Sequence, residues 1–291
     1  MLNAGFRLLD VDDAVQGCRI AVSLLYPTQG PERMMPFGPF QLPLAMSAPV
    51  EGEALQLVVI SHGSGGTPFT HRDLARHLAR SGFVVALVQH PGNHRGDDSL
   101  AGKVSNLQNR PRHLRLVMDA VFGDAELGRH LAPGVAIVIG HSMGGYTALA
   151  IAGGNPRSFP GETSDGTTGP VEVEHDGRVK AIVLLAPATV WFLEPGELSD
   201  VKVPILMRTG EKDFLLAPIH TQIVEQGIRD PKQLDHRVVP NAGHFAFLSA
   251  YPAAMKTPAI PPSQDPEGFN REAYLPVMFE EIVAFVRAAG R

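Results

Sequence analysis

The sequence has only one cysteine, Cys18, among its 291 residues. A single thiol cannot form an intrachain disulfide, and it excludes zinc or iron–sulfur sites built from several cysteines. Long apolar runs are also missing, because no stretch approaches the roughly 20 residues that a helix needs to cross a bilayer. We therefore expect no membrane span, and cysteine usage leaves the compartment open.

The first residues, "MLNAGFRLLDVDD", lack the basic segment and apolar core of an export signal. We expect a cytoplasmic protein, and a mature exported form whose signal was removed is the open alternative. Runs of lysine or arginine are absent as well, and the formal net charge is -5. This charge balance offers no cluster of positive charge that would bind the phosphates of a nucleic acid. The expected partner is a small molecule, and the expected state is a monomer or homodimer.

The apolar residues, 44% of the chain, gather in short runs that are continuous rather than alternating: "LQLVVISH", "GFVVALVQH", "VAIVIGHS", "VKAIVLLAPA" and "VPILMRTG". Such runs are typical of strands with both faces covered. Between them lie stripes with helical spacing, marked by Leu74 and Leu78, by Leu114, Val117, Met118 and Val121, and by Met278, Ile282 and Phe285. The alternation predicts one α/β domain over residues 1–291, with a mostly parallel sheet between helices.

Four segments lie outside this alternation. "CRIAVSLLYP" predicts an antiparallel edge strand that ends at Pro27. Residues 31–53, rich in proline and methionine, predict an ordered loop or lid over the sheet. Residues 153–177 and 251–276 predict small loop insertions, and the second of these leads into the last helix.

One stretch, "VAIVIGHSMGGYTALAIAG", places Ser142 between an apolar strand and an alanine-rich helix. Gly140 and Gly144 flank the serine in the pattern G-x-S-x-G, which is typical of a nucleophile elbow. A strained strand-to-helix turn then holds the hydroxyl above the sheet, at the positive end of the helix dipole. The alternative is a glycine turn whose serine only caps the helix.

An elbow serine needs a base, and the base needs an acid that orients it. "ILMRTGEKDF" supplies Asp213 and "HRVVPNAGHFAF" supplies His244, each just beyond the carboxyl end of an expected strand. Three rivals are weaker: Glu211 falls earlier in its turn, His220 in an expected helix and His236 within a strand. We expect Ser142, His244 and Asp213 to act together.

The tetrahedral intermediate of ester cleavage requires two backbone N–H donors. Met143, directly after the nucleophile, supplies one. The glycine-rich loop "SHGSGG" supplies the other, from Ser64 or alternatively from Gly65. A phosphate-binding loop is disfavoured, because the segment lacks the Walker lysine and the G-x-G-x-x-G spacing.

These motifs resemble a known family. In order, "SHGSGG", "DLARHLARSGFVVALVQHPGN", "GHSMGG", "TGEKD" and "AGHFAF" are similar to the α/β-hydrolases grouped with predicted dienelactone hydrolases and plasma-type platelet-activating factor acetylhydrolases. The resemblance runs from "LLYPT" to "VAFV". It implies an α/β-hydrolase fold and a serine esterase with Ser142, Asp213 and His244 as triad. Authentic dienelactone hydrolases use a cysteine nucleophile, so the resemblance says little about the substrate.

Other side chains could line the substrate pocket or bind a ligand. Trp191 and Phe245 are pocket candidates, with core packing as the alternative for both, and His62 is either a third candidate or a packed residue behind the loop. His90 and His94 could suggest a metal, but Pro91 and Gly92 prevent a shared helical face, so a loop at the pocket rim is expected. We expect no metal and no cofactor.

The sequence thus predicts a hydrolase of carboxylic esters, with short acyl chains preferred because the insertions are small and polar. Two alternatives remain open. The same triad could cleave amides, thioesters or carbon–carbon bonds or act as a perhydrolase, or the chain could be a binding protein on a hydrolase scaffold.

Overall fold

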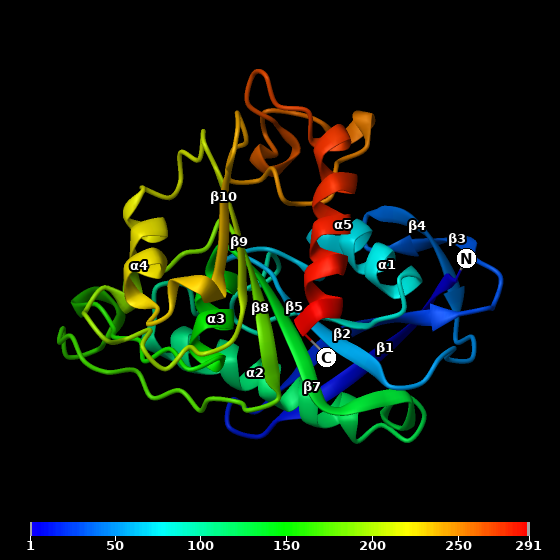
Figure 1. Cartoon of the computed structure of the whole chain (residues 1–291), viewed down its shortest axis with the longest axis horizontal. Coiled ribbons are helices and arrows are strands. Elements are labelled where there is room, and N and C mark those ends of the chain that lie inside the picture. Colours follow the sequence, from blue (N-terminus) through cyan, green and yellow to red (C-terminus); the bar gives the residue numbers. More distant parts are fainter. Residues whose placement is uncertain (1, 290–291) are drawn as a thin grey trace.

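The computed structural model describes residues 2–289 of the chain. Within that range one sheet has the strand order β10-β9-β8-β7-β5-β6-β2-β1-β4-β3 (Figure 1). The strands are β1 (Asn3–Asp13), β2 (Cys18–Thr28), β3 (Arg33–Phe37), β4 (Phe40–Met46), β5 (Leu55–Ser61), β6 (Val84–Val88), β7 (Leu131–His141), β8 (Val179–Leu185), β9 (Ile205–Gly210) and β10 (Leu234–Val239). From β6 to β10 all neighbours are parallel, as predicted.

Helices cover both faces of this sheet. They are α1 (Arg72–Arg80), α2 (Val104–Phe122), α3 (Met143–Ile151), α4 (Ile219–Gly227) and α5 (Arg271–Ala289). Figure 1 shows α1 and α5 side by side on the face nearer the viewer, with α2 and α3 behind the sheet. Of the helices within residues 2–289, none is long and apolar enough to cross a membrane.

The continuous apolar runs reflect two hydrophobic cores. Along β7, Ala136 and Val138 pack into the core beneath α2 and α3, whereas Ile137 and Ile139 pack into the core beneath α1 and α5. Successive side chains of a strand point to opposite faces, so a strand between two helical layers must be apolar at every position. This confirms the predicted fold class.

The N-terminal part of the sheet differs from the prediction. The edge-strand assignment for the segment from Cys18 is wrong, because β2 is an interior strand between β6 and β1. Strand β1, which pairs with β2 along its whole length, mixes polar and apolar residues and gave no clear signal. Pro27 does not end β2: pairing with β6 stops at Leu25, so the missing N–H removes no bond on that side.

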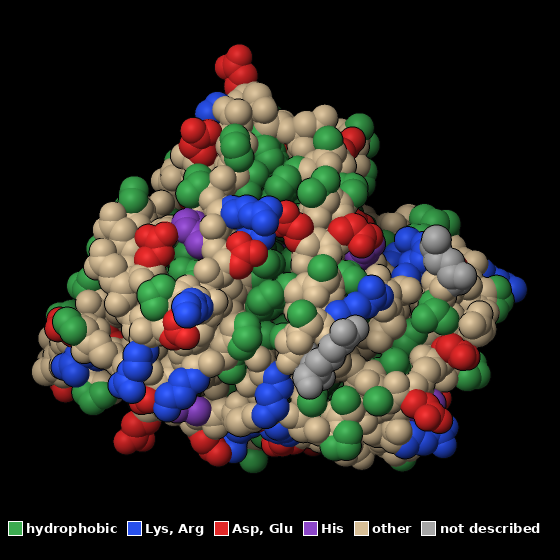
Figure 2. All heavy atoms as spheres, in the orientation of Figure 1, with side chains coloured by type: hydrophobic (Ala, Val, Ile, Leu, Met, Phe, Trp, Pro, Cys, Tyr) green, Lys and Arg blue, Asp and Glu red, His purple; other side chains and the backbone are tan. Residues whose placement is uncertain are grey.

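Residues 31–53 are not a loop over the sheet. Strands β3 and β4 form an antiparallel hairpin, with Gly38 in the left-handed region at its tip. Residues 153–177 and 251–276 are largely irregular with short 3₁₀ turns, as expected, and the second segment leads into α5. On the face shown in Figure 2, acidic and basic side chains are interspersed.

The parallel strands place the sequence motifs at one edge of the sheet. Residues His62, Ser142, Asp213 and His244 follow β5, β7, β9 and β10, respectively. Because parallel strands present their carboxyl ends at the same edge, segments far apart in the sequence meet there.

Candidate active site

Ser142 lies in a sharp turn between β7 and α3, with φ 53° and ψ −117°. A residue other than glycine is rare in this conformation, and the strain persists only where surrounding contacts fix the turn. Here the Ser142 N–H donates to the Leu185 carbonyl at 3.0 Å, and its own carbonyl accepts from the N–H groups of Gly145 and Ala188. The end of β8 thus holds the turn in place.

The flanking glycines are required by close backbone contacts. A Cβ on Gly140 would lie 2.0 Å from the Gly144 carbonyl oxygen, and one on Gly144 would lie 2.0 Å from the Ser61 carbonyl oxygen. Gly145 is restricted in the same way by Pro187. The G-x-S-x-G pattern therefore has the geometry of an elbow and not only its spacing.

Asp213 and His244 contact each other directly. His244 Nδ1 lies 2.8 Å from Asp213 Oδ2, and the other oxygen of Asp213 accepts the N–H groups of Leu215 and Leu216 at 2.9 and 3.0 Å. Burial raises the pKa of Asp213, but the hydrogen bond and charge of His244 outweigh burial, and the pKa is lowered overall. The ionised carboxylate accepts the Nδ1 proton, which leaves His244 Nε2 free to act as a base.

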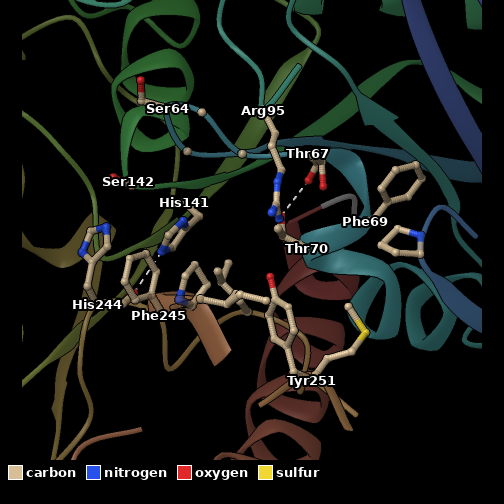
Figure 3. Close-up of a pocket in the computed structure, with 18 of the residues that line it drawn as sticks. Ser64, Thr67, Phe69, Thr70, Arg95, His141, Ser142, His244, Phe245 and Tyr251 are labelled. Atoms are coloured by element: carbon tan, nitrogen blue, oxygen red, sulfur yellow. Dashed lines mark hydrogen bonds between the residues drawn. The ribbon is translucent and has the colours of Figure 1, made fainter. Parts of the chain in front are cut away.

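His141 holds the backbone of the histidine loop. Its Nε2 donates to the His244 carbonyl at 3.0 Å, and the two ring centroids are 4.9 Å apart (Figure 3). Burial lowers the pKa of His141 well below its usual range. A neutral His141 can therefore hold the His244 backbone without placing a positive charge of its own beside that ring.

The rival residues make other contacts. The Glu211 carboxylate accepts the N–H of Asn241 at 2.7 Å and so joins the turns after β9 and β10. His220 Nδ1 accepts the N–H of Thr189, and His236 lies between Thr209 and Glu225. Among the described residues, none of the three makes a hydrogen bond to Ser142 or His244.

The glycine-rich loop after β5 lies against Ser142. A Cβ on Gly63 would be 3.2 Å from the Cβ of Ser142, so only glycine allows this approach without a shift of the neighbours. The Ser64 side chain points away from the interior of the cavity (Figure 3), and its Oγ accepts from Asn93 at 2.8 Å. In the described part of the chain, the backbone N–H groups of Ser64 and Met143 donate no hydrogen bond.

Ser142 and His244 line one cavity of about 640 Å³. Its apolar wall comes from the tip of the β3–β4 hairpin, the 3₁₀ turn before α1 and the segment after His244: Pro39, Phe40, Phe69, Phe245, Leu248, Tyr251, Met255, Ile260 and Pro262. Arg95 contributes a charged side chain (Figure 3). Within the described residues no hydrogen bond joins Ser142 Oγ to His244, and such bonds commonly form only when substrate is bound.

The three pocket candidates divide. Phe245 lines the cavity, whereas Trp191 and His62 lie outside it in packed positions, the alternative that the sequence left open for both. Trp191 packs on Tyr146 and donates from Nε1 to Glu162 at 2.8 Å. His62 is buried behind the loop, with Nδ1 2.7 Å from the Gly63 carbonyl.

Several residues at the site had no sequence signal of their own. Phe40 and Tyr251, which pack edge to face, come from segments expected to be loops.

His90 is not at the pocket rim, because it is buried between Ser61 and His113, while His94 Nδ1 accepts the N–H of Gly96. The rim position in this loop belongs to Arg95, and the motif "QHPGNHRGDD" was the signal that could have identified it.

The sheet order, the elbow and the placement of the acid and histidine loops define the fold as that of the α/β-hydrolases. Residues 52–162, which include the glycine-rich loop and the elbow, match the family model described as serine aminopeptidase, S33. The relatives found by structure have the same fold over nearly the whole chain.

A ferulic acid esterase from Streptomyces cinnamoneus superimposes with a TM-score of 0.70 at 22% identity, over 99% of this chain and 91% of that one. A dienelactone hydrolase from Anabaena variabilis gives 0.57 at 17% identity, over 96% of both chains. Platelet-activating factor acetylhydrolase of Cavia porcellus is 21% identical over 253 residues and covers 73% of this chain. The chain spans about half, 52%, of that relative.

Proposed function

We propose that this protein hydrolyses carboxylic esters through an acyl-enzyme on Ser142, with His244 as base and Asp213 as its orienting acid. The observation that carries the proposal is the 2.8 Å contact between Asp213 and His244, in a histidine loop that shares one cavity with a strained elbow serine. These are the parts that activate an ordinary hydroxyl for attack on a carbonyl.

In acylation, Ser142 Oγ bonds to the carbonyl carbon of the ester while His244 Nε2 takes the hydroxyl proton. The carbonyl oxygen becomes an oxyanion and accepts hydrogen bonds from the N–H groups of Ser64 and Met143. The bond to the alcohol oxygen then breaks, and His244 returns its proton to the leaving alcohol. Asp213 keeps the imidazole in the required tautomer and stabilises its protonated form.

In deacylation, His244 takes a proton from water as the water oxygen attacks the acyl carbon. The second tetrahedral intermediate accepts hydrogen bonds from the same two N–H donors. As it collapses, the bond between the acyl carbon and Ser142 Oγ breaks, His244 returns its proton to that oxygen, and the carboxylic acid is released. The complete cycle consumes one ester and one water and releases one alcohol and one carboxylic acid.

For the acyl group we propose a preference for short chains. The segments above the site are a hairpin and short 3₁₀ turns rather than a lid helix. A cavity of about 640 Å³ must hold the acyl and alcohol parts of the ester together. A panel of p-nitrophenyl esters from acetyl to palmitoyl should therefore give its highest kcat/KM at short chains, and a maximum at palmitoyl would contradict the preference.

The proposal is tested by replacing the nucleophile. Ser142→Ala should lower kcat for p-nitrophenyl acetate about 10⁴- to 10⁶-fold, because loss of the serine removes the covalent route. Ser164→Ala, at an exposed loop position, is the matched control and should keep full activity. Retention of one tenth or more of the wild-type kcat in Ser142→Ala would overturn the assignment.

A further inference from the structure

A fully buried arginine lies behind the glycine-rich loop. Arg110, in α2, is 0% exposed, and the structure places no carboxylate of residues 2–289 within ion-pair distance of it. Arg112, two residues along the same helix, pairs instead with Asp13 at 2.8 Å. Burying a guanidinium without a counterion is costly, so its neutral partners must hold it closely.

Most of those partners adjoin the two segments that carry the proposed oxyanion donors, and one, Asn93, lies in the loop after β6. On the side of the glycine-rich loop, Arg110 Nη2 donates to Ser61 Oγ at 3.1 Å and also to the His62 carbonyl. Arg110 Nη1 donates to Asn93 Oδ1 at 2.6 Å. Because a guanidinium only donates, Asn93 must turn its carbonyl toward Arg110. Its amino group then donates to Ser64 Oγ at 2.8 Å and to Asp98 Oδ1 at 2.6 Å.

On the elbow side, Arg110 Nε donates to Thr147 Oγ1 at 3.0 Å. The Thr147 hydroxyl in turn donates to the Met143 carbonyl at 3.0 Å. One rigid, planar group thus connects through single bridging residues to Ser64 and to Met143. The backbone bonds of this loop, from the Gly66 N–H to the Gly63 carbonyl and from the Arg95 N–H to the Gly66 carbonyl, are made by the glycines on either side of Ser64 and not by Ser64 itself.

We propose that Arg110 is the positioning residue of the oxyanion hole. Its guanidinium fixes the distance between the N–H groups of Ser64 and Met143 through Asn93 and Thr147. Its positive charge, which reaches the Asp98 carboxylate only through Asn93, also lies on the side of the hole away from substrate and favours the oxyanion over the neutral carbonyl. This inference rests on the proposed ester hydrolysis and assigns Arg110 no contact with substrate.

The test compares Arg110→Met and Arg110→Lys with wild type on p-nitrophenyl acetate. Loss of one oxyanion donor lowers kcat by about 10²- to 10³-fold in other serine hydrolases, and we expect Arg110→Met to fall in the same range. KM should change less than about threefold, because the ground-state carbonyl needs the donors much less. Arg110→Lys keeps the charge but not the fork of donors, so it should regain only part of kcat.

A second readout separates positioning from a general loss of structure. A trifluoromethyl ketone forms an oxyanion adduct with the nucleophile, so its Ki should rise in Arg110→Met by the same factor by which kcat/KM falls. Arg115→Gln removes an arginine of the same helix whose partner, Glu174, is exposed, and it should change neither value. Thermal unfolding identifies any variant that fails to fold.

If Arg110→Met does not fold, Ser64→Ala provides the alternative. This change removes the hydroxyl that Asn93 binds but keeps the backbone donor, and we expect kcat to fall several-fold. Combined with Arg110→Lys, it should add little further loss, because both changes break the same connection. Fully multiplicative losses would contradict the connection through Asn93.

The positioning role is overturned if folded Arg110→Met keeps kcat and the Ki of the ketone within about threefold of wild type, or if its loss is confined to KM. Failure of the proposed function gives a different result from failure of the Arg110 role, since the wild type itself would then lack Ser142-dependent esterase activity. In that case a crystal structure of Arg110→Met still tests the inference: a Ser64 loop in the wild-type position would refute it.

Discussion

The candidate site consists of a few single residues, and most of them could be selected from the local sequence alone. Ser142 and Asp213 follow strands whose ends could be placed from continuous apolar runs, whereas the strand before His244, β10, is short and mixes polar with apolar residues. Arg110 could not be identified in this way. An arginine within a helical pattern is normally assigned to the solvent face, and only the packing of α2 against β5 and α3 shows that it is buried.

Substitutions of Asp213 and Glu211 test which carboxylate orients His244. Asp213→Asn should lower kcat about 10⁴-fold, because an amide favours the wrong tautomer of His244 and cannot stabilise its protonated form. Glu211→Gln is the matched change two residues away, and it should keep kcat within about threefold because Glu211 binds only a backbone N–H of the next turn. Steady-state kinetics on p-nitrophenyl acetate decides between them. The reverse order of effects would make Glu211 the acid.

At the scale of elements, long apolar strands and striped helices were predicted correctly, whereas the N-terminal half of the sheet was not. Strands β1, β3 and β4 are recognised only by their partners, since β1 alternates irregularly and the hairpin contains Pro36 and Pro43. Strand pairing is a non-local property, so a single sequence window cannot supply it. The consequence for the site is that Phe40 of the cavity wall was missed.

A buried hydrogen bond between α2 and α3 leads to a prediction about stability. Pro111 has no N–H, so the Leu107 carbonyl four residues earlier loses its helical partner, and the buried Tyr146 hydroxyl donates to it at 3.0 Å. Tyr146→Phe should therefore lower the free energy of unfolding by about 1–3 kcal/mol, because a buried carbonyl is left unpaired.

Tyr274→Phe is the contrasting variant, since the buried Tyr274 hydroxyl has no hydrogen-bond partner among the described residues. Its removal should leave stability unchanged or raise it. Urea denaturation measures both variants. Equal destabilisation of the two would show that the Leu107 carbonyl does not depend on Tyr146.

At the scale of the whole molecule, a buried polar network joins the first strand to the active site. Asp13, at the end of β1 and 1% exposed, contacts Arg112 at 2.8 Å and His113 at 3.4 Å. His113 Nδ1 lies 3.1 Å from His90 Nδ1, and His90 Nε2 lies 2.9 Å from Ser61, a partner of Arg110. The N-terminal strand thereby supports residues that are distant in the sequence.

The network predicts how stability depends on pH. Burial raises the pKa of Asp13, but the hydrogen bonds of His113 and Arg112 outweigh burial and lower the pKa well below its ordinary value of 3.8. A carboxyl with a lowered pKa in the folded state stabilises the fold fully above the unfolded pKa and loses that contribution as pH falls. Asp13→Asn should therefore cost about 3–5 kcal/mol at pH 7 and less at pH 3.

Urea denaturation at the two pH values checks this prediction. Asp10→Asn, at an exposed position of the same strand, is the control and should change stability little at either pH. A cost for Asp13→Asn that is the same at both values would mean that the carboxylate charge does not stabilise the fold.

The proposed function requires that folding make the hydroxyl of Ser142 a nucleophile. Labelling with a fluorophosphonate, followed by mass spectrometry of the proteolysed protein, tests it most directly because only an activated serine reacts readily. We expect a single adduct on the peptide that contains Ser142, absent from Ser142→Ala and formed much more slowly in Asp213→Asn. A folded wild-type protein that forms no adduct, or forms it on another serine, would contradict the account.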